Sequence, residues 1–130
     1  MPENPTVELV VITPERQVLS ERTSFVAIPA HDGELGVLPM RAPLMCQLGV
    51  GELRYGQGGL ARRVFIDGGF AQVLADRVTV LAPEALPAEE ITAATITAAQ
   101  SAADKPDLSG EDRQRAARKV SVLRRLQSRD

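Results

Sequence analysis

The chain has 130 residues, of which 44% are hydrophobic, 25% charged and 3% aromatic, a balance typical of a folded protein rather than a disordered one. A single cysteine and a single histidine exclude an intrachain disulfide and a thiolate zinc cluster, and leave little for a multi-histidine metal site. The formal net charge of −2 is not that of a general nucleic-acid binder, and no apolar run reaches the roughly 18 to 20 residues of a membrane span. Because the N-terminus also lacks a signal-peptide pattern, we expect a soluble intracellular protein with one compact domain and an appendage.

The first two thirds of the chain has the pattern of short β-strands separated by turn residues. Residues 6–13 (TVELVVIT) are rich in β-branched side chains, and Pro14 ends this run. Similar runs recur, bounded by glycine, proline or Asp-Gly. The predicted strands are Thr6–Thr13, Val18–Ser20, Ser24–Ile28, Gly36–Leu38, Leu44–Leu48, Glu52–Tyr55, Val64–Ile66, Phe70–Leu74 and Arg77–Leu81. Many short strands with frequent turns predict an antiparallel sandwich or barrel over residues 1–85.

After residue 86 the hydrophobic period changes to that of helices. Pro87 suits the first turn of a helix, and the helix dipole favours Glu89 and Glu90 at that end. The pair Lys105-Pro106 ends this first helix, because proline cannot continue it. Its predicted apolar face consists of Ile91, Ala94, Ala98 and Ala102.

A second helix is predicted after a short connection. Ser109 stands three residues before Asp112, which is the spacing of a capping box. The predicted apolar face of this helix consists of Ala116, Val120, Leu123 and Gln127, with Leu126 beside it. Two helices joined by about five residues form an antiparallel hairpin, which we expect over residues 86–130.

Charge is unevenly distributed along the chain. Residues 1–85 carry seven arginines against ten carboxylates, whereas residues 113–130 carry seven cations against Asp130 alone. The final helix is therefore strongly basic although the whole chain is nearly neutral. The final helix lacks the alternating acidic residues with which a surface helix usually pairs its own cations. We therefore predict that it contacts an acidic partner protein or the acidic first helix. The alternative is a solvated face without a partner.

Three local patterns are candidates for chemistry. His31, Asp32 and Glu34 could bind a metal or relay a proton in a small metal-dependent enzyme, but no second histidine exists, and a polar turn is the favoured interpretation. Residues 56–59 (GQGG) lack the Lys-Ser/Thr and the following helix of a phosphate loop, so they predict a turn. Cys46 has no activating base nearby and is predicted to be a small buried hydrophobe. The chain is therefore predicted to be non-catalytic.

Longer segments carry a more specific pattern. Residues 28–44 (IPAHDGELGVLPMRAPL) contain a GE-x-G core followed by a proline and an APL segment. Residues 64–82 (VFIDGGFAQVLADRVTVLA) contain a GGF strand pair and a VTVLA strand, and the opening TVELVVITPERQVLSE has the form of two strands and their turn. In order and spacing, these segments resemble the epsilon subunit of F-type rotary ATP synthases, over about residues 6–85.

The resemblance implies a ten-stranded antiparallel β-sandwich followed by a two-helix hairpin. It implies a non-catalytic central-stalk subunit of a proton-translocating ATP synthase, with no catalytic residue, metal or cofactor of its own, that couples c-ring rotation to ATP synthesis. The sandwich of residues 1–85 is expected to bind the gamma subunit and the c ring, and the hairpin of residues 86–130 to be regulatory toward alpha and beta. No nucleic acid is expected, and membrane association is expected through the complex alone, at the cytoplasmic face of the bacterial inner membrane. The alternative is a free-standing β-sandwich module that binds another protein.

The resemblance also suggests contact residues. Glu34 matches the acid of the GE-x-G core, and Arg41 stands where many relatives have histidine before APL, so both are expected on a loop that faces the c ring. In relatives the hairpin extends toward beta and hinders ATP hydrolysis. The candidate inhibitory contacts to beta are Arg115, Arg118, Lys119, Arg124 and Arg125. Residues 89–100 (EEITAATITAAQ) lack the arginine of the relatives' ATP-binding motif, so no nucleotide-binding residue is expected. The glycines that match the family, interpreted as requirements of backbone geometry, are Gly33, Gly36, Gly68 and Gly69.

Overall fold

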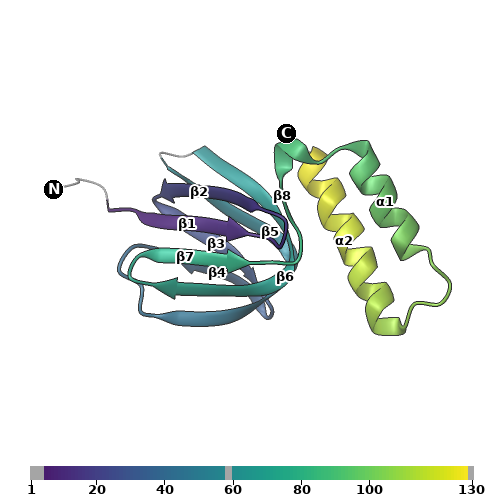
Figure 1. The fold of residues 1–130 in the computed structure, drawn as a ribbon, viewed down its shortest axis with the longest axis horizontal. Coiled ribbons are helices and arrows are strands. Elements are labelled where there is room, and N and C mark those ends of the chain that lie inside the picture. The colour runs from purple at the N-terminus through teal and green to yellow at the C-terminus, as the bar shows by residue number, and fades with distance from the viewer. Residues whose placement is uncertain (1–4, 58–59, 129–130) are drawn as a thin grey trace.

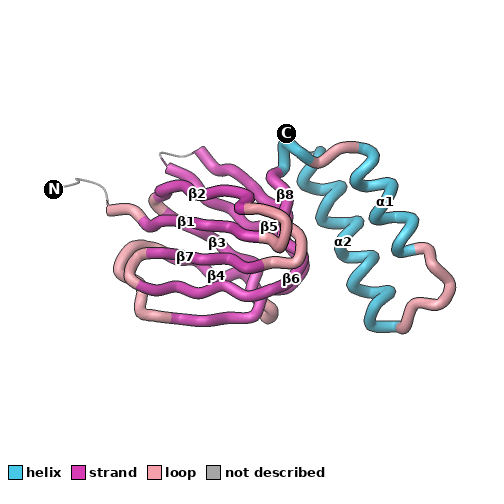
Figure 2. Tube along the Cα trace, viewed as in Figure 1, coloured by secondary structure: helices cyan, strands magenta, loops and turns pink. Residues whose placement is uncertain are grey.

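The computed structural model, which describes residues 5–57 and 60–128, consists of a β-sandwich with a helical hairpin packed at one end (Figure 1). The strands are β1 (Val7–Ile12), β2 (Gln17–Thr23), β3 (Phe25–Ala30), β4 (Gly33–Val37), β5 (Leu44–Gln57), β6 (Leu60–Leu74), β7 (Arg77–Leu81) and β8 (Ala85–Pro87). A short 3₁₀ turn (Ala88–Glu90) leads to α1 (Ala93–Ala103) and α2 (Gly110–Ser128). Strand and helix are separated along the chain as the sequence predicts (Figure 2). Of the predicted turn at residues 56–59, residues 58 and 59 lie outside the described residues, and Gly56 and Gln57 belong to β5.

The described strands form one rolled sheet in the order β2-β1-β7-β6-β5-β3-β4, with β8 paired to β6. The prediction of ten strands is wrong for the described residues, which form eight. The reason is that β5 and β6 each run through two predicted strands, so that both long strands contribute to both layers. The prediction of purely antiparallel pairing is also wrong, because β1 and β7 pair in parallel. Their pairing closes the sandwich through the long connection that a parallel pair needs.

Glycines allow β5 and β6 to bend without ending. The pairs Leu48–Gly69 and Val50–Asp67 leave Gly49 and Gly68 between them without a ladder partner. Gly68 and Gly69 have φ of 77° and 100°, in the left-handed region that disfavours other residues. A Cβ on Gly69 would lie 2.1 Å from the carbonyl oxygen of Leu81. The bend therefore requires glycine at residue 69, both for its backbone angle and for the close approach of β7.

The interior of the sandwich is an aliphatic core from both layers. Its fully buried side chains include Leu9, Val26, Ile28, Leu53 and Ile66. They alternate with outward-facing residues along each strand, as expected for a half-buried sheet. The core also holds the ring of Tyr55, whose hydroxyl donates to Glu21 Oε2 at 3.0 Å. Burial, with this hydrogen bond, raises the pKa of Tyr55 to about 12.

Helix α1 begins later than predicted. Thr92 caps it by accepting a hydrogen bond from the N–H of Thr95, so Glu89 and Glu90 lie in the 3₁₀ turn rather than in the first turn of the α-helix. The predicted apolar face is wrong at Ala94, Ala98 and Ala102, which are exposed, whereas Ile91, just before the helix, is buried as predicted. The buried residues of α1 are Ile96 and Ala99, with Ala103 packed beside them. Alanine occurs on every side of this helix, so its spacing is a weak guide, and the larger Ile96 decides which face is buried.

Helix α2 agrees with its prediction. The N–H of Asp112 donates to Ser109 Oγ at 3.1 Å, which confirms Ser109 as the cap. Val120, Leu123 and Leu126 are buried, as their spacing predicts, and Val122 is buried with them. These residues form a second apolar cluster with Ile96 and Ala99 of α1 and with Val50 and Phe65 of the sandwich. The hairpin is thus docked on the outer side of β5 and β6.

This second cluster gives a direct test of the hairpin's stability. Leu123 is fully buried, so Leu123→Ala is expected to reduce the free energy of unfolding by about 2 to 5 kcal/mol, through lost burial and the cavity left behind. Guanidinium unfolding followed by circular dichroism at the helix signal measures the change. Ser121→Ala, on the exposed side of the same turn, is the matched control and is expected to change it by less than about 0.5 kcal/mol. Equal effects from the two variants would contradict the observed packing.

Candidate functional site

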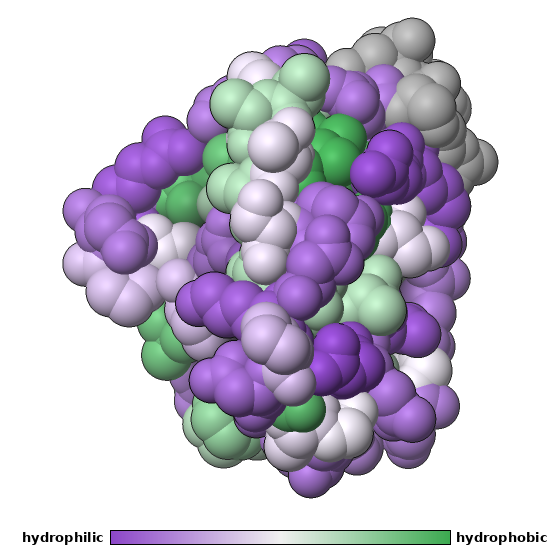
Figure 3. Space-filling view, turned by 90° about the vertical axis from the view of Figure 1, so that its right-hand side faces the viewer, coloured by the Kyte–Doolittle hydropathy of each residue, from purple (hydrophilic) through white to green (hydrophobic). Residues whose placement is uncertain are grey.

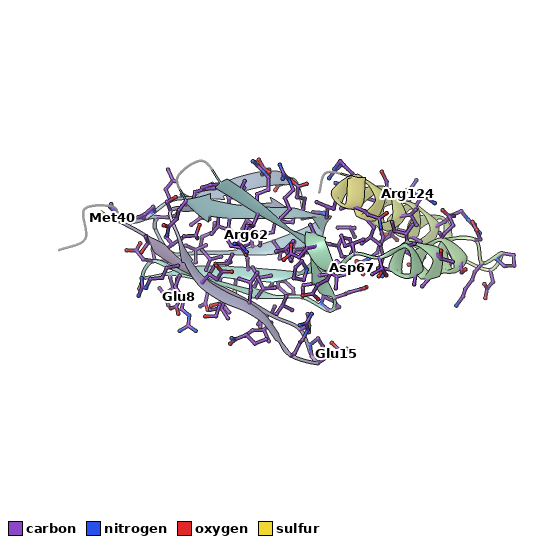
Figure 4. All side chains as sticks on the ribbon, turned by 90° about the horizontal axis from the view of Figure 1, so that it is seen from above. Glu8, Glu15, Met40, Arg62, Asp67 and Arg124 are labelled. Carbon is purple, nitrogen blue, oxygen red and sulfur yellow. The ribbon has the colours of Figure 1, made fainter. Side chains whose placement is uncertain are left out.

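Basic side chains of α2 contact acidic side chains of the sandwich. Arg115 Nη2 lies 3.0 Å from Asp67 Oδ1, and Lys119 Nζ lies 3.6 Å from Asp67 Oδ2. Lys119 also pairs with Glu84, which precedes β8. Figure 4 shows Asp67 at the junction of sandwich and hairpin. The carboxylates that pair with Arg115 and Lys119 therefore belong to the sandwich rather than to α1.

Other arginines of α2 have separate surroundings. Arg118 Nε donates to the carbonyl of Val50 at 2.7 Å, and Arg113 donates to the carbonyls of Lys105, Pro106 and Leu108 in the connection between the helices. Arg124 and Arg125 are exposed, and no salt bridge between Arg124 and another described residue is found. Of the predicted contacts to beta, Arg115, Arg118 and Lys119 are therefore engaged within the chain in this docked arrangement.

A polar cleft of about 690 Å³ separates part of α2 from the β3–β4 turn and the bend of β5. Its charged lining residues are Glu34, Glu52, Glu111, Arg115, Arg118 and Arg125, with His31 at the turn. Acidic side chains of β4 and β5 thus face cationic side chains of α2 across it. Figure 3, which looks onto the hairpin end of the molecule, shows a mostly hydrophilic surface there.

Glu34 is part of a charge network on the outer side of β5. Its Oε1 lies 2.8 Å from Arg54 Nη2, and Arg54 and Arg63 lie 3.6 and 3.5 Å from Glu52 Oε2. The side chain of Glu34 is 53% exposed, so it remains accessible to a partner, whereas that of Glu52 is 10% exposed. Glu34 follows the turn of His31 and Asp32, which confirms the turn interpretation of that cluster.

Arg41 lies at the other end of β4 from Glu34, so the two residues do not share one loop. Arg41 is exposed in the β4–β5 connection, directly after Met40, which Figure 4 shows at the end of the sandwich away from the hairpin. Met40 has a φ of 68°, and its N–H donates to Asp76 Oδ1 at 2.6 Å. Leu38 and Met40 are both exposed at this end. Strand β4 therefore separates the two predicted c-ring contacts.

The outer face of β5, β6 and β7 carries exposed apolar side chains that were not predicted as contact residues from the sequence. They are Met45, Phe70, Leu74 and Leu81, each at least half exposed. Phe70 pairs with Leu81 across the β6–β7 ladder, and Met45 pairs with Gln72 across β5–β6. Because their strand neighbours point into the core, these four residues share one face, which we call the apolar outer face. Along residues 70–81, apolar side chains occupy both the inward-facing and the outward-facing positions of the strands. That sequence pattern could have revealed the apolar outer face.

The described residues contain no group of three or more His, Cys, Asp or Glu side chains placed to hold a metal ion. Cys46 is half-buried and packs against the core of the sandwich, where burial raises the pKa of its thiol. Within the part of the chain that the structure describes, no helix is long and apolar enough to cross a membrane.

By architecture, the chain is a β-sandwich that carries a docked helical hairpin, with exposed apolar side chains on its outer face and basic side chains along α2. Residues 6–88 match the family model of the ATP synthase delta/epsilon chain, β-sandwich domain. An ATP synthase epsilon chain of Syntrophobacter fumaroxidans is 42% identical over 95% of this chain and 92% of its own length. That of Solibacter usitatus is 51% identical over 66% of this chain and 64% of its own length.

Two solved structures of ATP synthases also contain a chain with this fold. A chain in the Euglena gracilis mitochondrial ATP synthase, in a structure of OSCP, F1 and the c-ring, superposes with a TM-score of 0.69 at 25% identity, over 99% of this chain and 89% of that one. A chain from the Tetrahymena thermophila mitochondrial ATP synthase shares the fold, with a TM-score of 0.63 at 14% identity, over 98% of both chains. The chain belongs to the ATP synthase delta/epsilon family, as an epsilon chain. It is a non-catalytic subunit of the central stalk.

Proposed function

We propose that the sandwich of residues 1–85 binds the gamma subunit and the c ring, and so couples c-ring rotation to ATP synthesis by the alpha and beta subunits of a proton-translocating enzyme. The observation that carries this proposal is the apolar outer face. Large apolar side chains grouped on one sheet face expose a patch that single proteins rarely leave uncovered, and such patches mark protein–protein contacts. Gamma is the partner that we assign to this face.

The c-ring contact is assigned to the exposed charged residues of the sandwich. Glu34 and Arg41 lie at opposite ends of β4. A single polar loop of a c subunit therefore contacts only one of them, and contact with both residues requires two different loops. The pair of Glu34 with Arg54 holds the carboxylate in place at modest energetic gain, since exposed ion pairs contribute about 0.2 to 1 kcal/mol. Exposed charged residues of this kind therefore contribute to the orientation and register of the c-ring contact rather than to its affinity.

We also propose that the hairpin of residues 86–130 regulates hydrolysis. In an extended state, Arg115, Arg118, Lys119, Arg124 and Arg125 contact the acidic region of beta. In the docked state, Arg124 is exposed, whereas Arg115, Arg118 and Lys119 must first leave the sandwich. The complex holds the subunit peripherally at the cytoplasmic face of the bacterial inner membrane.

Reconstitution of the complex tests the coupling role. Adding the chain to an ATPase sector that lacks it is expected to restore gamma binding and proton-coupled ATP synthesis. Unchanged coupling would reject this role. A pull-down from native membranes distinguishes the free-standing module, because that module does not recover gamma, beta and the c subunit together.

Truncation after Pro106 tests the regulatory role separately. The sandwich core closes without α2, so the truncated chain is expected to assemble and to couple normally. ATP hydrolysis is expected to rise about 3- to 10-fold, because the inhibitory basic helix is removed. Steady-state hydrolysis by the reconstituted enzyme measures the change. Because removal of α2 uncovers Val50 and Phe65, a full-length chain with the five basic residues changed to glutamine is the control for altered packing. Hydrolysis that stays at the wild-type rate in both variants would exclude inhibition.

A further inference from the structure

The charged side chains on the outer side of β5 alternate in sign from β4 to β6. Glu34 of β4 pairs with Arg54 of β5, and Glu52 of β5 lies between Arg54 and Arg63 of β6. We call these four residues the charge ladder. Glu34 is its accessible end, because its side chain is 53% exposed, whereas that of Glu52 is 10% exposed.

Glu52 is required by the register of the two long strands. Arg54 and Arg63 are direct partners in the β5–β6 pairing, so their side chains emerge side by side on one face, where like charges repel. Glu52 Oε2 lies 3.6 Å from Arg54 Nε and 3.5 Å from Arg63 Nε, and so offsets this repulsion. One carboxylate oxygen therefore holds both arginines, and without it the two guanidinium groups would move apart.

Arg54 transmits this restraint to Glu34 across β3, which lies between β5 and β4. The β3 residue opposite Arg54 is Ala27, and the β4 residue opposite Ala27 is Gly36, so small residues leave a path for the long side chain. Arg54 Nη2 lies 2.8 Å from Glu34 Oε1, while its Nε faces Glu52. The guanidinium is a rigid plane, so the direction of the Glu34 carboxylate depends on Glu52.

We propose that Glu52 and Arg54 are positioning residues for Glu34, and that together they aim its carboxylate at a partner segment that presents a cation. A carboxylate is an acceptor only, so this end of the charge ladder selects donors and positive charge. A carboxylate that is already held meets such a group without first losing side-chain freedom, which favours productive encounters. The inference rests on the proposed contact of Glu34 with the c ring, and adds what orients that contact.

The test measures the association rate of the full-length chain with a purified c ring in lipid nanodiscs. Surface plasmon resonance at low ionic strength is used, because exposed charges are least screened there. Glu34→Gln is expected to slow association about threefold, and Glu52→Gln and Arg54→Gln about twofold each. Glu15→Gln is the matched control: it removes a carboxylate from the exposed β1–β2 turn, and its expected effect is less than about 1.5-fold.

The two positioning variants separate positioning from direct electrostatics, because they remove opposite charges. Toward a cationic segment, the loss of Glu52 as a charge alone would slow association, whereas the loss of Arg54 would speed it. Positioning predicts slower association in both variants. It also predicts that Glu34→Gln combined with Arg54→Gln is no slower than Glu34→Gln alone, because Arg54 acts through Glu34.

A rate for Glu52→Gln or Arg54→Gln that equals or exceeds that of the wild type, beside a slower Glu34→Gln, would overturn the proposal and leave the c-ring contact standing. A wild-type rate for Glu34→Gln would reject the c-ring contact of this residue and the proposal with it. Circular dichroism checks that each variant is folded. Where Glu52→Gln does not fold, Arg54→Gln decides alone, because the side chain of Arg54 is 33% exposed.

Discussion

Replacing Gly69 by alanine is expected to reduce the free energy of unfolding by about 3 to 4 kcal/mol. The new Cβ would lie 2.1 Å from the carbonyl oxygen of Leu81 and 2.8 Å from the Cα of Ala82, both of which are backbone atoms that cannot rotate away. The φ of 100° adds strain for any residue with a side chain. The close approach of β7 to the bend of β6 must therefore be lost or the backbone shifted.

Urea unfolding of the full-length chain, followed by far-ultraviolet circular dichroism, measures this loss. Gly36→Ala is the matched control, because a Cβ at Gly36 in the edge strand β4 meets nothing within 4 Å. Its expected effect is smaller than about 1 kcal/mol in either direction. A Gly69→Ala chain as stable as Gly36→Ala would show that β7 does not approach the bend as closely as described.

Replacing Phe70 by glutamate is expected to weaken gamma binding about 100-fold while leaving the chain folded. Phe70 is 54% exposed on the apolar outer face, so the free chain tolerates a charge there. In a contact with gamma, the same carboxylate would be taken out of water without a partner, and truncating a central aromatic residue alone commonly costs 2 kcal/mol or more, on the order of a 30-fold change. The two effects together give the expected size.

Surface plasmon resonance between the chain and purified gamma measures the affinity. Gln72→Glu is the matched control, since Gln72 is an exposed polar residue two positions along the same strand, and its expected effect is less than about fivefold. Equal losses in the two variants would point to general charge repulsion, and no loss in Phe70→Glu would place gamma on another surface.

The division into strands and helices was predictable because it depends on local periodicity. The β-branched run of β1 and the Ser109 cap of α2 are both found as predicted. The number of strands was not predictable, because a glycine between two apolar runs is equally consistent with a turn between two strands and with a bend within one strand. The pairing of Leu48 with Gly69 keeps β5 and β6 continuous through the bend, and only that long-range ladder distinguishes the two cases.

The buried face of α1 shows the same limit on a smaller scale. Ala94, Ala98 and Ala102 have helical spacing, but alanine loses little free energy when it stays exposed, so spacing alone does not select a face. The buried face is instead the one that contains Ile96 and Ala99, which pack against α2. In α2, by contrast, Val120, Leu123 and Leu126 are large enough for spacing to predict burial correctly.

From composition, spacing and charge, the sequence by itself determined that residues before about 86 form strands, that the rest form a helical hairpin, and that the final helix is basic. Tertiary structure decided what that charge meets: Asp67, 48 residues before Arg115, is brought beside it by the bend of β6. It also decided that Glu34 and Arg41 lie at opposite ends of β4 and that Phe70 and Leu81 lie together on an outer face. Local patterns report periodicity within a few residues, whereas these contacts depend on how distant strands pair and where glycine lets them bend.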